Sequence, residues 1–247
     1  MLAPTLEQRL ACQKRPSGSP VMFQKWSELL FLHWEVDPDL IKRRLPKELH
    51  LDLHEGKAYL GIVPFYMQRI RPRFLPCVPK LSDFLELNVR TYVHDDQGRP
   101  GVWFFSLDCD QPIAVEIARK LFHLPYQHAD MSAQNQDEII DYHCQRKGHS
   151  KKAHYRYGPK NDALKTSQPG TLEFFLLERY LLFSQRNNGT IYCGQVHHEP
   201  YQFTEANVSE MNRAPFQWEN FEVSGKAISQ LYSPGPPVEI FPLRKQE

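Results

Sequence analysis

The sequence lacks the features that would place it in an oxidising compartment or in a membrane. Its five cysteines are odd in number and widely spaced, with no CxxC pair, so we expect no disulfide framework. No run approaches the roughly 18 apolar residues of a membrane span, and the N-terminal residues carry charge where a signal peptide would be apolar. We therefore expect a cytoplasmic protein that does not contact a membrane.

Net charge and the common cofactor motifs are also scarce. The formal net charge of +1 argues against a generic binder of nucleic acid. The chain has no P-loop, GxGxxG, HExxH or GxSxG motif. His197 and His198 are adjacent and would point to opposite sides of a strand. The other histidine-rich positions match no metal motif; they are His143, Cys144, His149 and His154. The sequence therefore predicts neither a cofactor nor a metal site.

What the chain does contain is strand-like patterning interrupted by proline. Its 20 prolines against 12 glycines indicate many stiff turns, which are typical of β-rich proteins. Residues 1–20 are interpreted as an N-terminal arm and residues 21–247 as a single domain, because no repeat and no clean linker divides them. The expected class is mainly β with a few short helices.

Hydrophobic periodicity and turn residues predict the individual elements. Residues 129–170 show no decisive pattern, and residues 234–247 read as a proline-rich tail. The expected strands are 27–36, a hairpin over 49–70 with its turn at 54–57, a second hairpin made of 84–93 and 101–108, and a returning strand that ends at 198; the expected helices are 37–46 and 110–124. Residues 171–185 could form a strand or a helix, and the turn and returning strand that follow favour a strand.

The stretch FLELNVRTYV, residues 84–93, alternates between two kinds of side chain. One face carries Leu85, Leu87, Val89, Thr91 and Val93, and the other carries Phe84, Glu86, Asn88, Arg90 and Tyr92. The pattern leaves two interpretations open, a solvent-exposed outer face or the lining of a site. Arg90 lies about 13 Å along the strand from Glu86, a separation that suits two ends of one small ligand. A carboxylate enclosed by apolar groups would have a raised pKa, which suits proton transfer near neutral pH.

Other polar groups lie among apolar neighbours. Ser106 and Asp108 share one predicted face of their strand, although a serine nucleophile would need a base within hydrogen-bond reach. Glu178 and Tyr180 share a face in LLERYLLF, where they either complete the same polar interior or belong to a structural ion pair. His198 is a further candidate. The basic run 146–160, with interleaved tyrosines, either contacts a polyanion or is a solvated loop, and the overall neutrality favours the loop.

Several segments resemble a bacterial family of uncharacterised proteins of the YqjF type. The matching segments are LLFLHWEVDPDLIKRRLPKELHLD, RPRFLPCVP, FLELNVRTYV, GVWFFSLD, ARKLFHLPY, LLERYLLF and VHHEPY, in order from about residue 26 to about residue 205. That family is grouped with the acetoacetate decarboxylase superfamily. The resemblance implies an antiparallel sheet closed into a cone or barrel with an internal pocket. Closure would explain why so many strands here are apolar on both faces.

The resemblance also implies which residues would occupy the decarboxylase positions. Those enzymes use a lysine that forms a Schiff base, a nearby acid and an arginine. Glu86 is the counterpart of the acid, whereas the lysine position corresponds to Tyr126, followed by Gln127, and neither side chain can form an imine. The arginine position falls at Ser27, with Lys25 close by. We therefore expect the acid without the amine, and no lysine-dependent acetoacetate decarboxylation.

The combined hypothesis is an internal pocket for a small molecule. Its expected lining is Glu86, Asn88, Arg90, Tyr92 and Tyr126, with Ser106, Glu178 and His198 as further members. The first interpretation is an enzyme acting on a small carboxylate or carbonyl compound: Glu86 moves a proton, Arg90 holds an anionic group and Tyr126 donates a hydrogen bond. The second is a binding module without turnover. Nucleic-acid binding through 146–160 ranks below both. Decarboxylase relatives assemble into rings or stacks, but no residue here specifies a homo-oligomer.

Overall fold

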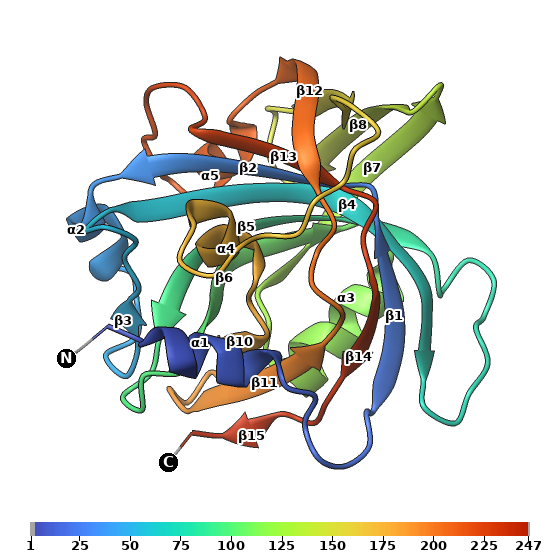
Figure 1. The fold of residues 1–247 in the computed structure, drawn as a ribbon. Helices are drawn as coiled ribbons and strands as arrows, with labels where there is room; N and C mark the ends of the chain where they lie inside the picture. The colour runs from blue at the N-terminus through green and yellow to red at the C-terminus, as the bar shows by residue number, and fades with distance from the viewer. Residues whose placement is uncertain (1–2, 247) are drawn as a thin grey trace.

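A computed structural model of the chain describes residues 3–246 (Figure 1). The strands are β1 (Met22–Ser27), β2 (Leu29–Val36), β3 (His50–Leu51), β4 (Ala58–Pro72), β5 (Phe84–His94), β6 (Pro100–Cys109), β7 (Tyr126–Gln136), β8 (Ile139–Arg146), β9 (Ala153–Pro159), β10 (Leu181–Gln185), β11 (Ile191–His197), β12 (Thr204–Met211), β13 (Ser229–Ser233), β14 (Pro237–Ile240) and β15 (Arg244–Lys245). The helices are α1 (Leu6–Gln13), α2 (Pro38–Lys42), α3 (Pro112–Ile117), α4 (Leu172–Leu177), α5 (Ala214–Trp218) and the π-helix η1 (Ala118–Phe122). The fold is therefore mainly β, as predicted.

The strands belong to one sheet that closes on itself. One circuit of hydrogen-bonded pairings runs β1–β14–β11–β10–β6–β5–β4 and back to β1, and a second runs β4–β2–β13–β12–β9–β8–β7–β6–β5 and back to β4. Strands β4, β5 and β6 belong to both circuits and form a wall between two barrel-like halves (Figure 1). Most pairings are antiparallel, while β6 pairs in parallel with both β7 and β10. This closure confirms the expected barrel.

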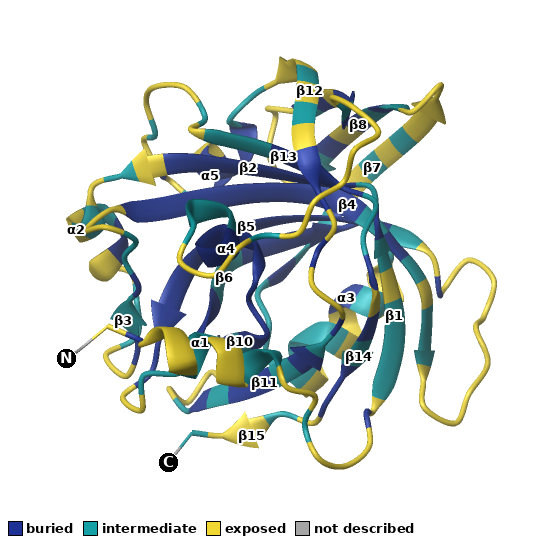
Figure 2. Cartoon of the chain, viewed as in Figure 1, coloured by how far each residue is buried: buried dark blue, intermediate teal, exposed yellow. Residues whose placement is uncertain are grey.

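The shared wall explains why β5 is buried on both faces, as its dark blue ribbon shows (Figure 2). Leu85, Leu87 and Val89 pack into the largest apolar cluster, which fills the half closed by β7, β8 and β9. Glu86 and Arg90 are only 3% and 8% exposed on the opposite face. The solvent-exposed interpretation of the polar row is therefore wrong, because closure of the sheet covers both sides of the strand.

The pairing expected for 49–70 is wrong. Strand β3 pairs with β5, and β4 pairs with β1, β2 and β5, so β3 and β4 do not form a ladder. A single bridge between His54 and Lys57 joins the two arms at the predicted turn. By contrast, β5 and β6 pair in antiparallel fashion over nearly their whole length, which confirms the second hairpin.

The strand expected at 171–185 is also wrong in its first half. The Thr171 hydroxyl accepts the backbone N–H of Phe174 at 3.2 Å, and this cap starts helix α4, whose residues other than Glu173 are apolar. Strand β10 begins only at Leu181. The helix expected at 110–124 is present in two parts, α3 followed by η1, and Pro112 occupies its first turn as predicted.

The remaining segments have secondary structure that the sequence pattern does not predict. Residues 129–170 contain most of the β7–β8–β9 ladder, and the proline-rich tail contributes β14 and β15. In the N-terminal arm, α1 carries a capping box, and Arg9 pairs with Asp52 at 2.7 Å. All five cysteines are free, which confirms the absence of disulfides. Among residues 3–246, no helix combines the length and the apolar character required to cross a bilayer.

Candidate functional site

Glu86 is an enclosed acid on the polar face of β5. The Tyr126 hydroxyl, at the start of β7, donates a hydrogen bond to the Glu86 Oε2 atom at 2.5 Å. Burial raises the pKa of Glu86 to about 7, and the hydrogen bonds from Tyr126 and Asn88 moderate that rise because they favour the charged form. Burial also raises the pKa of Tyr126 well above its ordinary value, so the phenol stays a donor. Glu86 can therefore accept or release a proton near neutral pH.

Arg90 and Tyr92 lie on the same face, further along the strand. The Arg90 Nη2 atom and the Tyr92 hydroxyl both donate to the carbonyl oxygen of Leu176 in α4, at 3.1 and 2.9 Å. Because Tyr92 donates to that carbonyl, the His33 Nε2 atom, 2.6 Å from the Tyr92 oxygen, is assigned as a donor to it. Burial and the nearby Arg90 charge hold the pKa of His33 well below its ordinary value, so this imidazole is neutral.

Glu178 and His198 belong to a third polar group beside the first two. The Tyr180 hydroxyl donates to the Glu178 carboxylate, which also accepts the backbone N–H of Tyr201 at 3.1 Å. The His198 ring stacks on Tyr180 with ring centroids 4.6 Å apart. Burial lowers the pKa of His198 to about 4, and its Nδ1 atom lies 2.7 Å from the carbonyl oxygen of Glu199. The imidazole is therefore neutral, with Nε2 as an acceptor.

Phe31 connects the second and third groups. The Arg90 guanidinium lies 5.3 Å from the centre of the Phe31 ring, and Phe31 packs edge-on against Tyr201 with centroids 5.3 Å apart. The Arg90 charge favours the ionised form of Tyr201 across this contact, although burial dominates and raises the pKa of Tyr201 overall. Seven of the eight predicted site residues thus belong to these three groups in the half of the barrel closed by β1, β10, β11 and β14.

Ser106 is the exception. A bulge at Phe105 shifts the pairing between β5 and β6, so Ser106 lies opposite Val89 on the other face of the wall. Arg146 donates to Ser106 at 2.6 Å and to both carboxylate oxygens of Asp108 at 2.6 and 2.9 Å. Ser106 therefore supports a buried ion pair in the apolar half of the barrel, and placing it in the Glu86 group is wrong.

Two other polar features are structural. Arg179 donates to Asp52 at 2.7 Å, and Asp52 also accepts from Arg9, which ties the N-terminal helix to the barrel. In the basic run 146–160, Tyr155 and Tyr157 are fully buried in the apolar cluster. Those tyrosines are not available to stack on bases, which removes the feature that suggested a polyanion.

Several buried polar atoms of the site have no hydrogen-bond partner within residues 3–246. They are Asn88 Oδ1, Arg90 Nε, His198 Nε2 and His33 Nδ1. A buried polar atom without a partner costs free energy, so native proteins rarely keep several in one region. The site therefore contains both hydrogen-bond donors and hydrogen-bond acceptors without a partner in the described part of the chain.

A groove of about 1030 Å³ lies beside η1 and the β10–β11 turn. Its charged lining residues are Arg44, Glu116, Arg119, Lys120 and Arg186, so positive charge predominates. None of the predicted site residues lines it. Phe104 and Leu124 line the groove and also pack against the apolar cluster that contains Tyr126.

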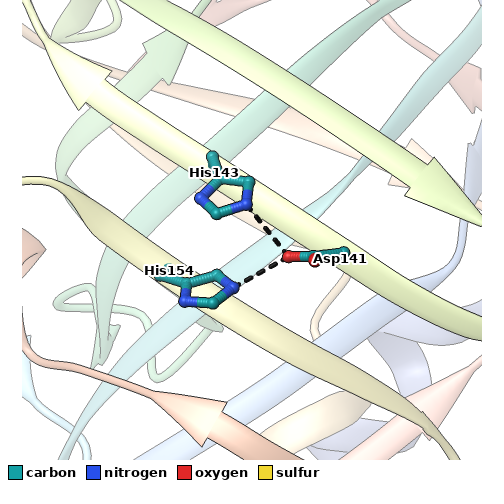
Figure 3. A group of neighbouring side chains, drawn as sticks. All are labelled: Asp141, His143 and His154. Atoms are coloured by element: carbon teal, nitrogen blue, oxygen red, sulfur yellow. Dashed lines mark hydrogen bonds and ion pairs between the residues drawn. The ribbon is translucent and has the colours of Figure 1, made fainter.

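Sequence reasoning missed two sets of residues. The sequence predicts His33 only as part of a buried strand, although a histidine in an otherwise apolar run indicates a polar contact in the interior. The second set is Asp141, His143 and His154, whose ligand-type atoms all lie within 4.8 Å of one another (Figure 3). A hairpin predicted over 139–146 and 153–159 would place these side chains next to one another, because Asp141 and His143 alternate with apolar residues in β8.

Comparisons with known proteins agree with this architecture. The model of the family DUF2071, described as an uncharacterized conserved protein, matches residues 23–237. The uncharacterized protein YqjF of Bacillus subtilis (strain 168) is 40% identical over 197 residues, which cover 78% of this chain and 80% of YqjF.

Solved structures share the fold at low sequence identity. An acetoacetate decarboxylase from Legionella pneumophila superposes with a TM-score of 0.63 at 13% identity, covering 100% of this chain and 98% of that one. An acetoacetate decarboxylase-like enzyme from Sphingomonas wittichii RW1 gives 0.64 at 12% identity, with 93% and 94% covered. The enduracididine biosynthesis enzyme MppR, complexed with pyruvate, gives 0.61 at 13% identity, with 94% and 93% covered. The fold is thus acetoacetate decarboxylase-like, and the chain belongs to the DUF2071 family.

Proposed function

We propose that this protein binds a small carboxylate or carbonyl metabolite in the polar half of the barrel and that Glu86 exchanges a proton with it. The observation that carries the proposal is the enclosed pair of Glu86 and Tyr126. An acid with a pKa of about 7 and a neutral phenol 2.5 Å away form a proton-transfer unit suited to neutral pH.

The unused hydrogen-bonding atoms define the ligand class. Arg90 supplies positive charge and a free Nε–H for a carboxylate. When Glu86 is protonated it can donate to the Tyr126 oxygen, which frees the Tyr126 proton for a carbonyl oxygen of the ligand. His198 Nε2 accepts a hydrogen bond from a hydroxyl group of the ligand. The solved structure of MppR, which shares the fold, is that of the enzyme complexed with pyruvate, a small keto acid of this class. The positive charge that lines the groove beside η1 favours the approach of an anion.

The chemistry proceeds without an imine. Tyr126 stands where the resemblance places the lysine of the decarboxylases, and no lysine is among the buried residues of the 3–246 span. Lys25, close to the arginine counterpart, is exposed. The proposed reaction is therefore proton transfer at a carbon or oxygen next to a carbonyl group, with Glu86 as base or acid.

A ligand screen followed by isotope exchange tests the proposal. Thermal-shift measurements against small keto acids, hydroxy acids and aldehydes are made on the wild type beside Glu86→Gln and Arg90→Gln, with the exposed Glu222→Gln as the matched control. We expect at least one compound to raise the melting temperatures of wild type and Glu222→Gln by similar amounts. The same compound should raise the melting temperature of Arg90→Gln by less. If no compound shifts the wild type, the proposed site is wrong.

The compounds that bind are then incubated in D₂O at pH 7 and followed by proton NMR. We expect exchange at the carbon next to the carbonyl with wild type, and its loss with Glu86→Gln. Binding without exchange would reduce the protein to a binding module and refute the catalytic role of Glu86. Borohydride treatment with a keto acid should leave every lysine unmodified, and a lysine adduct would refute the imine-free chemistry.

A further inference from the structure

Three ligand-type side chains converge on the outer face of the β8–β9 hairpin. His143 and His154 are direct cross-strand partners, and Asp141 is two residues before His143 on the same face. Figure 3 shows both imidazoles directed at one carboxylate oxygen. The Nε2 atoms of His143 and His154 lie 3.0 and 2.8 Å from Asp141 Oδ1. Among residues 3–246 this is the one such group whose ligand atoms all lie within 4.8 Å of one another.

The observed separations of 3.0 and 2.8 Å are slightly shorter than those between ligand atoms of one metal ion. With metal–ligand bonds of about 2.0–2.2 Å in tetrahedral geometry, neighbouring ligand atoms are roughly 3.3–3.5 Å apart. A small opening of the two nitrogen–oxygen distances would therefore admit an ion. The imidazole rings are stacked, with centroids 4.2 Å apart and planes 10° apart, so both present the same edge to Asp141. Moving each imidazole proton to Nδ1 frees both Nε2 lone pairs without any loss of protons.

We propose that Asp141, His143 and His154 bind one divalent transition-metal ion, with Zn²⁺ as the representative of the class. Two imidazoles and one carboxylate favour Zn²⁺, Cu²⁺, Ni²⁺ or Co²⁺ over Mg²⁺ and Ca²⁺, which prefer oxygen ligands. The side chains are between one third and one half exposed, so water completes the coordination.

The site is separate from the Glu86 group. The two histidines lie on the solvent side of β8 and β9, whereas Tyr142 and Tyr155, their neighbours in sequence, point into the apolar cluster. An ion at this position would join the middle of two adjacent strands and resist separation of the hairpin. Arg156 competes with it, because its Nη1 atom is 3.4 Å from Asp141 Oδ2.

Metal titration of tag-free, chelator-treated protein tests the site. Cys77 is an exposed thiol, so all measurements use a Cys77→Ser background. Isothermal calorimetry with ZnCl₂ should show one equivalent bound, and Co²⁺ should develop visible absorption bands from nitrogen and oxygen ligands. Loss of an outer-sphere partner typically weakens metal affinity by 10–100-fold, so His143→Ala or His154→Ala should weaken binding at least about tenfold.

Two further variants make the outcome decisive. His50→Gln removes another surface histidine, 2.6 Å from Asp96, and should leave the titration unchanged. Arg156→Gln should tighten binding, because it removes the competing charge. Absence of a saturable equivalent in the background protein would overturn the proposal. Equal affinity and stoichiometry in His143→Ala, His154→Ala and the background protein would also overturn it. Circular dichroism establishes that each variant is folded.

Discussion

Replacing Glu86 by glutamine should change how stability depends on pH. The pKa of Glu86 in the folded state is about 7, against an ordinary value of 4.5 for a glutamate, because burial penalises the carboxylate. Between these two values the unfolded chain releases the proton while the folded chain keeps it. The folded state therefore loses stability as pH rises through this window, and below pH 4.5 the group contributes nothing, since both states are protonated.

The magnitude follows from the size of the shift. A difference of about 2.5 pKa units at about 1.36 kcal/mol each amounts to about 3.4 kcal/mol over the whole window. Of this, about 2.5 kcal/mol falls between pH 5 and pH 8 for a single titrating site. Glutamine stays neutral throughout, so the free energy of unfolding of Glu86→Gln relative to wild type should rise by that amount across the same interval.

Urea denaturation at half-unit steps from pH 5 to pH 8 measures this difference. Subtracting the two curves removes the contributions of all other titrating groups, and the exposed Glu222→Gln supplies the control for a glutamate at the surface. Parallel curves for wild type and Glu86→Gln, within about 0.5 kcal/mol, would refute the reasoning, because they would mean that Glu86 titrates alike in both states. The proton-transfer role would then lose its physical basis.

Three further substitutions test the packing around the site, each by urea denaturation. Tyr126→Phe removes a hydrogen bond to Glu86 that favours its charged form, so it should cost about 1.5–3 kcal/mol at pH 8 and less at pH 5.5. Asp52→Asn leaves the Arg179 charge buried without its partner and should cost about 3–5 kcal/mol. Gly235→Ala places a Cβ 2.0 Å from a carbonyl oxygen of β1 at a φ of +81°, so we expect destabilisation by at least about 1–3 kcal/mol.

The polar face of β5 was readable from the sequence, because strand alternation is a local property. The grouping of Glu86 with Tyr126 came from the resemblance, since no local pattern connects two residues 40 positions apart. Ser106 was misplaced because a one-residue bulge at Phe105 reverses every side chain beyond it, and bulges leave no clear signal in a single sequence. The Thr171 cap was the one local signal that could have corrected the strand expected at 171–185.

The His143–His154 pair was missed for a different reason. Each histidine alone looks like an ordinary surface residue, and the two become a group only through the register of β8 against β9. Residues 129–170 have no decisive hydrophobic periodicity, so the sequence does not predict how β8 and β9 pair. Long-range pairing is set by closure of the whole sheet rather than by the segment itself, which limits what any local interpretation can predict.

Strand β5 also provides an internal comparison that separates structure from function. Its two faces belong to the same backbone, have the same length and are equally enclosed, yet one carries Leu85, Leu87 and Val89 while the other carries Glu86 and Arg90. The apolar face shows that a hydrocarbon lining is sufficient to fill one half of the barrel. The face that carries Glu86 and Arg90 lacks the stabilisation that apolar packing provides. It holds an acid with a pKa of about 7 and contains several polar atoms without partners. Those groups suit the small-molecule ligand that we propose for this half of the barrel.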